Sequence, residues 1–194
     1  MRFIARTGFL IALLFSLSAG MVQAKWEEKP SLRDRIFFGG NFGLQFGTVT
    51  NIEISPLAGI YLTPRLAVGP GIRYEYFRSN YPGYVPYDTH IYGGTVFARY
   101  MVIRDMSNAV GIGLNFGLFG HAEYEMLSLE SRYFKIGAPP DAVGRFNLHS
   151  ILVGGGIYQP IGRRGGFLIM VLWNLNETAN SPYSNPIFRI GFNF

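Results

Sequence analysis

Apolar and polar residues alternate along much of this chain with a period of two. Between Phe38 and Gly47 the even positions carry mostly large apolar side chains, and the odd positions carry only Gly, Asn and Gln. The segment 185–194 repeats this order. A period of two is that of a β-strand whose two faces meet different surroundings. The pattern therefore predicts strands with one apolar face and one face of small or polar residues.

Eight segments follow this pattern, which predicts an all-β protein. They span 38–47, 51–62, 66–77, 90–102, 109–124, part of 146–159, 167–175 and 185–194. The faces of the sixth segment stay open, because Ile151, Val153 and Ile157 compete for its apolar face with Phe146, Leu148 and Leu152. Strands of about 10 residues joined in sequence are typical of an eight-stranded antiparallel up-and-down transmembrane β-barrel.

The connections between the predicted strands alternate in length. If the first strand runs outward, the inner turns are 63–65, 103–108 and 160–166, and the outer connections are 48–50, 78–89, 125–145 and 176–184. All three inner turns are short, and every outer connection except the first is longer than any of them. Short turns on one side and long loops on the other are typical of outer-membrane barrels.

Charged residues within the strands indicate which face is internal. Glu53, Arg73, Glu75, Glu123 and Arg189 all lie opposite the apolar face of their own strand. A basic residue on the lipid face near the membrane midplane costs about 2 to 4 kcal/mol, so the polar face is predicted to be inside. A soluble, lipocalin-like carrier would have the reverse arrangement, with apolar residues inside.

The inside of so narrow a barrel is expected to be filled by side chains. The expected interior polar network consists of Glu53, Arg73, Glu75, Arg99, His121, Glu123 and Arg189, with Tyr61, Phe77, Phe97 and Phe119 taking up the remaining volume. Ion pairs are predicted to join the third, fourth and eighth strands to the second and fifth, because unpaired buried charges are costly.

The amino-terminal segment has the features of a secretory signal peptide. Arg2 and Arg6 precede an apolar core at 9–17, and small residues at 22–24 offer a cleavage site. We expect residues 1–24 to be removed, 25–34 to form a periplasmic segment and 35–194 to form one barrel domain. Without Arg2 and Arg6 the formal charge falls from +5 to about +3, which gives no indication of nucleic-acid binding. The chain has no cysteine, which excludes disulfides.

The last predicted strand ends on an aromatic residue. Phe188, Ile190, Phe192 and Phe194 share its apolar face. This ending resembles the terminal signal of Gram-negative outer-membrane barrels, which is read by the barrel-assembly machinery. That resemblance implies export, insertion among outer-membrane lipids and assembly by that machinery.

Longer stretches carry a family resemblance. The segments 54–74 (Ile-Ser-Pro-Leu-Ala-Gly-Ile-Tyr-Leu-Thr-Pro-Arg-Leu-Ala-Val-Gly-Pro-Gly-Ile-Arg-Tyr), 97–100 (Phe-Ala-Arg-Tyr) and 152–156 (Leu-Val-Gly-Gly-Gly) resemble the small outer-membrane β-barrel domain family, the porin-family or OmpA/OmpX-like barrels. The resemblance implies a fold and an outer-membrane location and no shared catalytic site. Pro56 and Pro70 should cause a bulge or a local ladder defect, because proline removes a ladder hydrogen bond.

Residues with catalytic chemistry are few. His121 and Glu123 share one face, and with a serine they would suggest a lipid hydrolase, but an interior polar network explains them better. His149 and Ser150 are adjacent and should point to opposite faces. His90 stands alone. No metal-ligand spacing occurs, and we expect no catalytic residue, cofactor or metal.

The second outer loop carries three tyrosines, Tyr81, Tyr84 and Tyr87, among prolines. They could present rings to an extracellular ligand through loops 78–89 and 125–145, or fold over the barrel mouth and the lipid headgroups. We expect a monomeric, non-enzymatic outer-membrane barrel with a structural or surface-interaction role and a plugged interior. The alternatives are a narrow passive channel and an outer-membrane lipid-modifying hydrolase.

Overall fold

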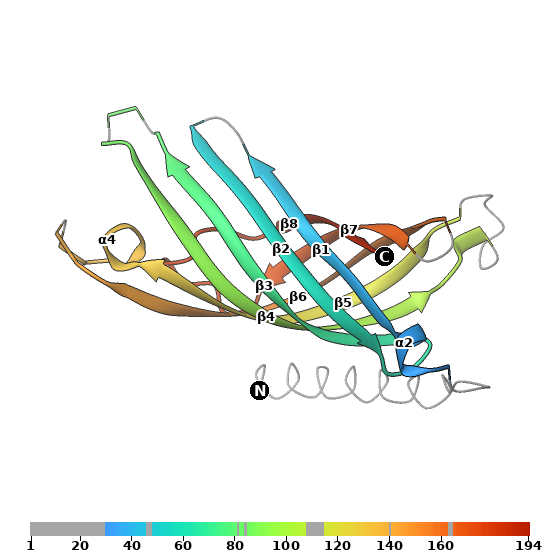
Figure 1. Cartoon of the computed structure of the whole chain (residues 1–194). Coiled ribbons are helices and arrows are strands. Elements are labelled where there is room, and N and C mark those ends of the chain that lie inside the picture. The colour runs from blue at the N-terminus through green and yellow to red at the C-terminus, as the bar shows by residue number, and fades with distance from the viewer. Residues whose placement is uncertain are drawn as a thin grey trace, which may run out of the picture.

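The chain folds into a closed barrel of eight antiparallel strands (Figure 1). The computed structural model describes residues 30–45, 48–80, 82–83, 85–107, 115–139, 141–162 and 165–194. The strands are β1 (Ile36–Gln45), β2 (Val49–Tyr61), β3 (Leu66–Ser79), β4 (Tyr87–Ile103), β5 (Gly117–Glu130), β6 (Arg145–Ile161), β7 (Gly165–Asn174) and β8 (Ile187–Asn193). Each pairs with its neighbours in sequence, and β8 pairs with β1. The predicted eight-stranded up-and-down barrel is confirmed.

The two ends of the barrel differ in the segments they carry. We call the end with the short helix α2 (Leu32–Arg35) and Phe194 the terminal end, and the opposite end, with α4 (Ser131–Phe134), the loop end (Figure 1). The terminal end has the connections 62–65, 104–116 and 162–164, and the loop end has 46–48, 80–86, 131–144 and 175–186. Among the described residues, no helix has the length and apolar character needed to cross a membrane.

Burial alternates most regularly along β5, β7 and β8, as the sequence pattern predicts. In β5 the odd positions from Gly117 to Leu129 are buried and the even positions are half-buried or exposed. The structure also assigns the faces of β6. Leu148 and Leu152 point inward and are buried, whereas Ile151 and Ile157 point outward.

The predicted position of the fifth strand is wrong. It was expected at 109–124, but β5 runs from Gly117 to Glu130, while residues 108–114 lie outside the described part. The partner strand sets the start, because β4 ends at Ile103 and its last pair is with Leu118, after a register shift at Met101. The alternation of apolar and polar residues alone does not show at which residue a strand begins to pair with its neighbour.

The expected alternation of connection lengths is therefore wrong at one place. The connection 104–116 replaces the predicted short turn 103–108 and exceeds the loop-end connection 80–86 in length. The loop expected at 78–89 is shorter because β3 extends to Ser79 and β4 begins at Tyr87, and that expected at 125–145 shrinks to 131–144. Tyr87 is thus a strand residue.

The prolines interrupt the β2–β3 ladder without changing its register. Ile54 pairs with Tyr74 and Leu57 pairs with Gly71, which is the same register on both sides of Pro56. Pro56 and Pro70 point outward. The expected ladder defect is present, but the expected alternative, a bulge, is not formed at this place.

Inward glycines make room for rings that fill the narrow interior. A Cβ atom on Gly59 would lie 2.2 Å from the ring of Phe37, and one on Gly166 would lie 2.3 Å from the ring of Tyr158. The glycines at 154–156 lie within β6 and pair with β5 and β7, so they form strand and no phosphate-binding loop. Glycine here is a packing requirement.

Phe194 takes part in closing the barrel. Its backbone N–H donates to the carbonyl of Phe38 at 2.8 Å, and the N–H of Phe38 donates to the carbonyl of Phe194 at 3.1 Å. The side chains of Phe188, Ile190, Phe192 and Phe194 are all exposed on the outer face, as the terminal pattern predicts.

Deleting Phe194 should therefore impair assembly. The change removes two hydrogen bonds between β1 and the end of the chain, together with an exposed aromatic ring beside Phe192. We expect less of the heat-modifiable, folded form on unboiled gels and more periplasmic degradation, whereas Phe194→Tyr should behave like the wild type. Normal folding of the deletion variant in cells would contradict the assembly-signal hypothesis.

Candidate functional site

The most distinctive feature of the barrel is a group of charged side chains inside it. All seven residues of the expected polar network point inward and are buried: Glu53, Arg73, Glu75, Arg99, His121, Glu123 and Arg189. They come from β2, β3, β4, β5 and β8. Each sits at an inward position of its strand, so the alternation that builds the sheet also brings these groups together.

Arg73 is bound by three carboxylates. Its Nη1 atom lies 2.6 Å from Oε2 of Glu125, and its Nη2 atom lies 2.7 Å from Oε2 of Glu75 and 3.2 Å from Oε2 of Glu53. These contacts join β3 to β2 and, across the lumen, to β5. Short, charge-assisted hydrogen bonds of this kind are among the strongest in proteins.

Arg189 on β8 binds carboxylates of the same group. Its Nη1 atom lies 2.8 Å from Oε1 of Glu123, its Nη2 atom lies 3.1 Å from Oε2 of Glu125, and its Nε atom lies 3.8 Å from Oε1 of Glu53. Glu125 and Glu53 therefore contact both arginines and make the two sets of ion pairs one cluster. We call Glu53, Arg73, Glu75, Glu123, Glu125 and Arg189 the charged cluster.

Each carboxylate of the charged cluster also accepts a hydrogen bond from a group outside it. Ser55 donates to Glu53 at 2.8 Å, Asn51 donates to Glu75 at 2.6 Å, His121 Nε2 donates to Glu123 at 3.1 Å, and the hydroxyl of Tyr183 donates to Glu125. These donors matter because four carboxylates face two guanidinium groups. Hydrogen bonds to charged groups contribute about 1.5 to 3 kcal/mol each and help to offset that excess of negative charge.

Arg99 was expected in the ion-pair network, and this prediction is wrong. None of its three guanidinium nitrogens has a hydrogen-bond partner among the described residues. Its Cζ atom instead lies 5.4 Å from the ring centre of Phe97 and 5.2 Å from that of Phe119. Arg99 lies opposite Ala67 and His121 in the sheet, nearer the terminal end than the carboxylates, and its guanidinium makes no hydrogen bond to any of them.

Apolar side chains fill the lumen around the charged cluster. Toward the terminal end, Phe37, Ala67 and Phe97 pack with Tyr61 and Leu57. Toward the loop end, Ile91, Leu127, Leu129 and Leu148 pack with Phe77, and a third group along β5 to β7 contains Phe119, Leu152, Leu168, Met170 and Leu172. The four rings expected to occupy the interior, Tyr61, Phe77, Phe97 and Phe119, all take part. The interior is thus packed on both sides of the ion pairs.

Two residues that are central to this site are not identified by the sequence pattern, Glu125 and Tyr183. Glu125 was assigned to a loop, although it continues the inward positions of Phe119, His121 and Glu123, and this parity was the available signal. Tyr183 lies in the connection 175–186, where no periodic pattern exists, so the sequence contained no signal for it. Its burial beside the Glu125 carboxylate raises the pKa of its phenol, which therefore stays protonated and can donate.

The remaining histidines point away from this site. His90 and His149 lie on the outer face, where their Nδ1 atoms lie 2.9 Å from the hydroxyl of Tyr74 and 2.7 Å from that of Tyr124, respectively. Ser150 points inward, so it shares no face with His149. Within the described residues, no group of three or more His, Asp or Glu is arranged to hold a metal ion.

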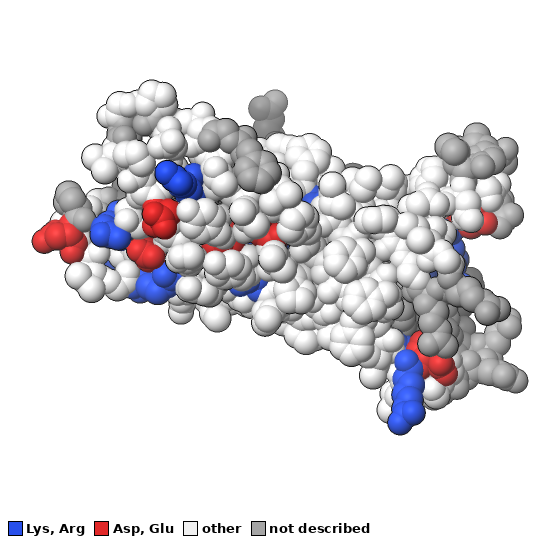
Figure 2. Space-filling view, turned by 45° about the horizontal axis from the view of Figure 1, so that its top comes forward, with Lys and Arg blue, Asp and Glu red and all other residues white. Residues whose placement is uncertain are grey.

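The outer face of the barrel is apolar over a broad band. Figure 2 shows charged side chains gathered toward both ends of the molecule and an almost uncharged surface between them. Exposed residues include Phe38, Phe42, Leu44, Ile54, Ile72, Val96, Ile151, Ile157, Phe167, Ile169, Trp173, Phe188 and Ile190. Tyr74, Tyr92 and Tyr124 are exposed in the half of their strands nearer the loop end, and Phe192 and Phe194 are exposed at the terminal end.

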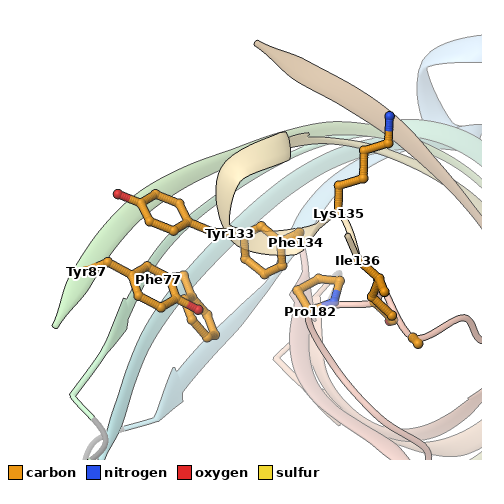
Figure 3. Close-up of a pocket in the computed structure, with 9 residues that line it drawn as sticks. Phe77, Tyr87, Tyr133, Phe134, Lys135, Ile136 and Pro182 are labelled. Carbon is orange, nitrogen blue, oxygen red and sulfur yellow. The ribbon is translucent and has the colours of Figure 1, made fainter. Parts of the chain in front are cut away.

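A pocket of about 310 Å³ opens at the loop end, between α4, the connection 175–186 and the ends of β3 and β4. In Figure 3 the rings of Phe77, Tyr87, Tyr133 and Phe134 lie on one side, Ile136 and Pro182 lie on the other, and the Lys135 side chain leads away. Tyr87 and Tyr133 stack at 4.2 Å. Of the three tyrosines expected in the loop, Tyr87 lines this pocket from the start of β4, and Tyr81 and Tyr84 lie outside the described residues.

Comparison with known proteins gives a likeness among solved structures. No known protein family and no curated protein matches this sequence. Among solved structures, the chain is similar to the crystal structure of the N-terminal β-barrel domain of Pseudomonas aeruginosa OprF. The two chains are 11% identical, the match covers 82% of this chain and 94% of that one, and the TM-score is 0.49. Both are β-barrels, and the strand pairing of this chain itself establishes its eight-stranded fold.

Arg189→Met and Arg99→Met should have different effects on stability. Losing Arg189 leaves carboxylates of Glu53, Glu123 and Glu125 short of a counter-charge, which should cost about 3 to 5 kcal/mol of unfolding free energy. Losing Arg99 removes contacts with two rings but also removes a buried charge without a hydrogen-bond partner, so the loss should be no more than about 2 kcal/mol. Urea unfolding of both purified variants measures the difference, and equal losses would contradict the charged cluster as described.

Proposed function

We propose that this protein is a non-enzymatic, integral outer-membrane barrel with a filled interior and a structural or surface-interaction role. The observation that carries the proposal is the distribution of charge between the two faces of the sheet. The buried charges lie inside the barrel, and the exposed face between its ends is apolar (Figure 2). A soluble protein would need the reverse arrangement, because large exposed apolar surfaces drive association in water.

The hydrocarbon core of a lipid bilayer is the environment that matches this apolar outer surface. The backbone polar groups of a closed barrel are paired within the sheet, which is the condition for strands to lie in hydrocarbon. Exposed tyrosines toward one end and phenylalanines at the other fit the two interfaces, where aromatic residues are enriched. In this proposal the terminal end faces the periplasm and the loop end faces outward, and residues 1–24 act as the export signal.

The filled interior supports a structural role over transport. Ion pairs cross the lumen from β3 and β8 to β5, and apolar layers lie on both sides of them. The channel alternative would need a continuous polar path through these layers. The pocket at the loop end supports the surface-interaction part of the proposal, since it lies where an extracellular ligand could reach the loops at 80–86 and 131–144.

The hydrolase alternative finds little support in the geometry. His121 lies at 3.1 Å from Glu123, but the nearby inward serines, Ser55 and Ser150, hydrogen-bond to Glu53 and to Asn174 and Tyr183. A nucleophilic serine would need the histidine as its hydrogen-bonded base. The charged groups instead bind one another.

The membrane placement predicts a position-dependent cost for one substitution. Val96, near the middle of β4, is 58% exposed, and Val85, in the connection 80–86, is 88% exposed. In lipid vesicles Val96→Arg should lower the unfolding free energy by about 2 to 4 kcal/mol, whereas Val85→Arg should leave it unchanged within error. Urea titrations followed by tryptophan fluorescence measure both. If the two variants unfold alike, the band around Val96 does not face lipid.

The filled interior predicts that the protein conducts no ions across a bilayer. The purified protein in planar bilayers should show no stable single-channel steps, because side chains of the charged cluster and of both apolar layers occupy the lumen. Arg189→Met should reduce stability without creating steps. Reproducible ohmic steps from the wild type that change in Arg189→Met would favour the channel instead.

A further inference from the structure

The connection between β7 and β8 sends one side chain into the barrel. The hydroxyl of Tyr183 donates to Glu125 and lies 3.3 Å from Oγ of Ser150, and its ring lies 5.3 Å from Cζ of Arg73. The ring also packs against the apolar groups around Leu152 and around Leu127. Tyr183 thus packs between the charged cluster and the apolar groups toward the loop end, directly over Ser150 and Glu125.

The base of this connection is fixed to the end of β7. The backbone N–H of Asn174 donates to Oδ1 of Asn185 at 2.6 Å, and Nδ2 of Asn185 donates to the carbonyl of Asn174 at 3.0 Å. These two bonds hold the position where the chain leaves the barrel. At the other end of the connection, the N–H of Leu175 donates to the carbonyl of Ile151 at 2.8 Å and the N–H of Ile151 donates to Oδ1 of Asn176 at 2.7 Å. The residues between these two anchored ends, 177–184, can move together.

The tip of the connection is held less firmly. A hydrogen bond of 2.9 Å from the backbone N–H of Ile136 to Oδ1 of Asn180 joins it to the neighbouring loop, and that bond is exposed. The aromatic pocket lies beside the tip, between α4 and Pro182 (Figure 3). Surface segments with few buried contacts open most readily.

The protonation state of Tyr183 also makes its withdrawal feasible. Burial beside Glu125 raises the pKa of the phenol, so a neutral side chain would leave the lumen. The carboxylate it leaves behind keeps its ion pairs with Arg73 and Arg189, and water can replace the lost phenol donor. Nothing in the strand ladder has to break for this movement.

We propose that residues 177–184 of this connection form a removable stopper that controls access from the loop end to the charged cluster, with Tyr183 as its seal. When Tyr183 withdraws, the first groups reached are Ser150 and the Glu125 carboxylate. Only the direction from which solutes arrive, the outside of the cell, rests on the proposed function. The seal itself is a property of the folded chain.

The absence of cysteine from the chain allows a direct test. Ser150 is 1% exposed beneath Tyr183, so Ser150→Cys places one thiol below the seal. The probe is a methanethiosulfonate reagent that carries a trimethylammonium group, which matches the carboxylate-rich lumen. Labelling rates are measured on purified protein in detergent micelles, after the heat-modifiable gel shift has shown that each variant is folded.

Ser150→Cys alone should react slowly. Adding Tyr183→Ala should raise the rate about tenfold or more, because the hydrogen bonds and the packing of the seal are lost together. Tyr183→Phe keeps the ring but loses the hydroxyl, so it should raise the labelling rate by a smaller factor. If Tyr183→Ala does not fold, the rate of the Tyr183→Phe variant tests the stopper in its place. Tyr133→Ala, which removes a ring of the pocket outside the lumen, is the matched control and should leave the rate unchanged.

Three results would overturn the stopper. One is fast labelling of Ser150→Cys with Tyr183 in place. The second is an unchanged rate when Tyr183 is replaced. The third is an equal rise with Tyr133→Ala, which would mean general loosening of the loops. The labelling rates are measured in micelles, so they do not depend on the placement of the barrel in a membrane. Rates that contradict the stopper would leave that placement intact, and Val96→Arg tests the placement separately.

Discussion

The structure depends on one constraint: carboxylates enclosed in a narrow barrel must be neutralised by other groups within it. Arg73 and Arg189 meet this requirement by binding glutamates on β2, β3 and β5, and the bonds run across the lumen as well as around the wall. Strands that are not neighbours in the sheet are thereby joined. The apolar layers on both sides exclude water and strengthen these ion pairs.

Much of this arrangement could be predicted because a strand repeats every two residues. Given that period, the inward positions of Glu53, Arg73 and Glu123 follow from the apolar residues beside them, and so does the barrel itself. The faces of β6 could not be chosen, because apolar residues such as Leu152 and Ile151 occupy both of them. In a barrel with an apolar outside and a partly apolar inside, polarity alone does not distinguish the faces of such a strand.

The features that could not be predicted depend on contacts between distant parts of the chain. The bounds of β5 follow from where β4 ends, so Glu125 was placed in a loop and left out of the cluster. The position of an inward residue along the barrel axis decides whether its side chain reaches a carboxylate. Arg99 lies nearer the terminal end, beside two phenylalanine rings. Tyr183 belongs to a loop with no repeating pattern, and only the folded structure brings it to Glu125.

The pairing of β8 with β1 bears on the order in which the protein matures. Arg189 arrives with β8, the last strand, whereas Glu53, Glu123 and Glu125 belong to strands made earlier. An open sheet of the first seven strands would hold four clustered carboxylates and only Arg73 to neutralise them. Because like charges repel, bringing these carboxylates together before β8 arrives would be unfavourable. The strand that closes the barrel against β1 thus also carries the arginine that completes the neutralisation of its interior.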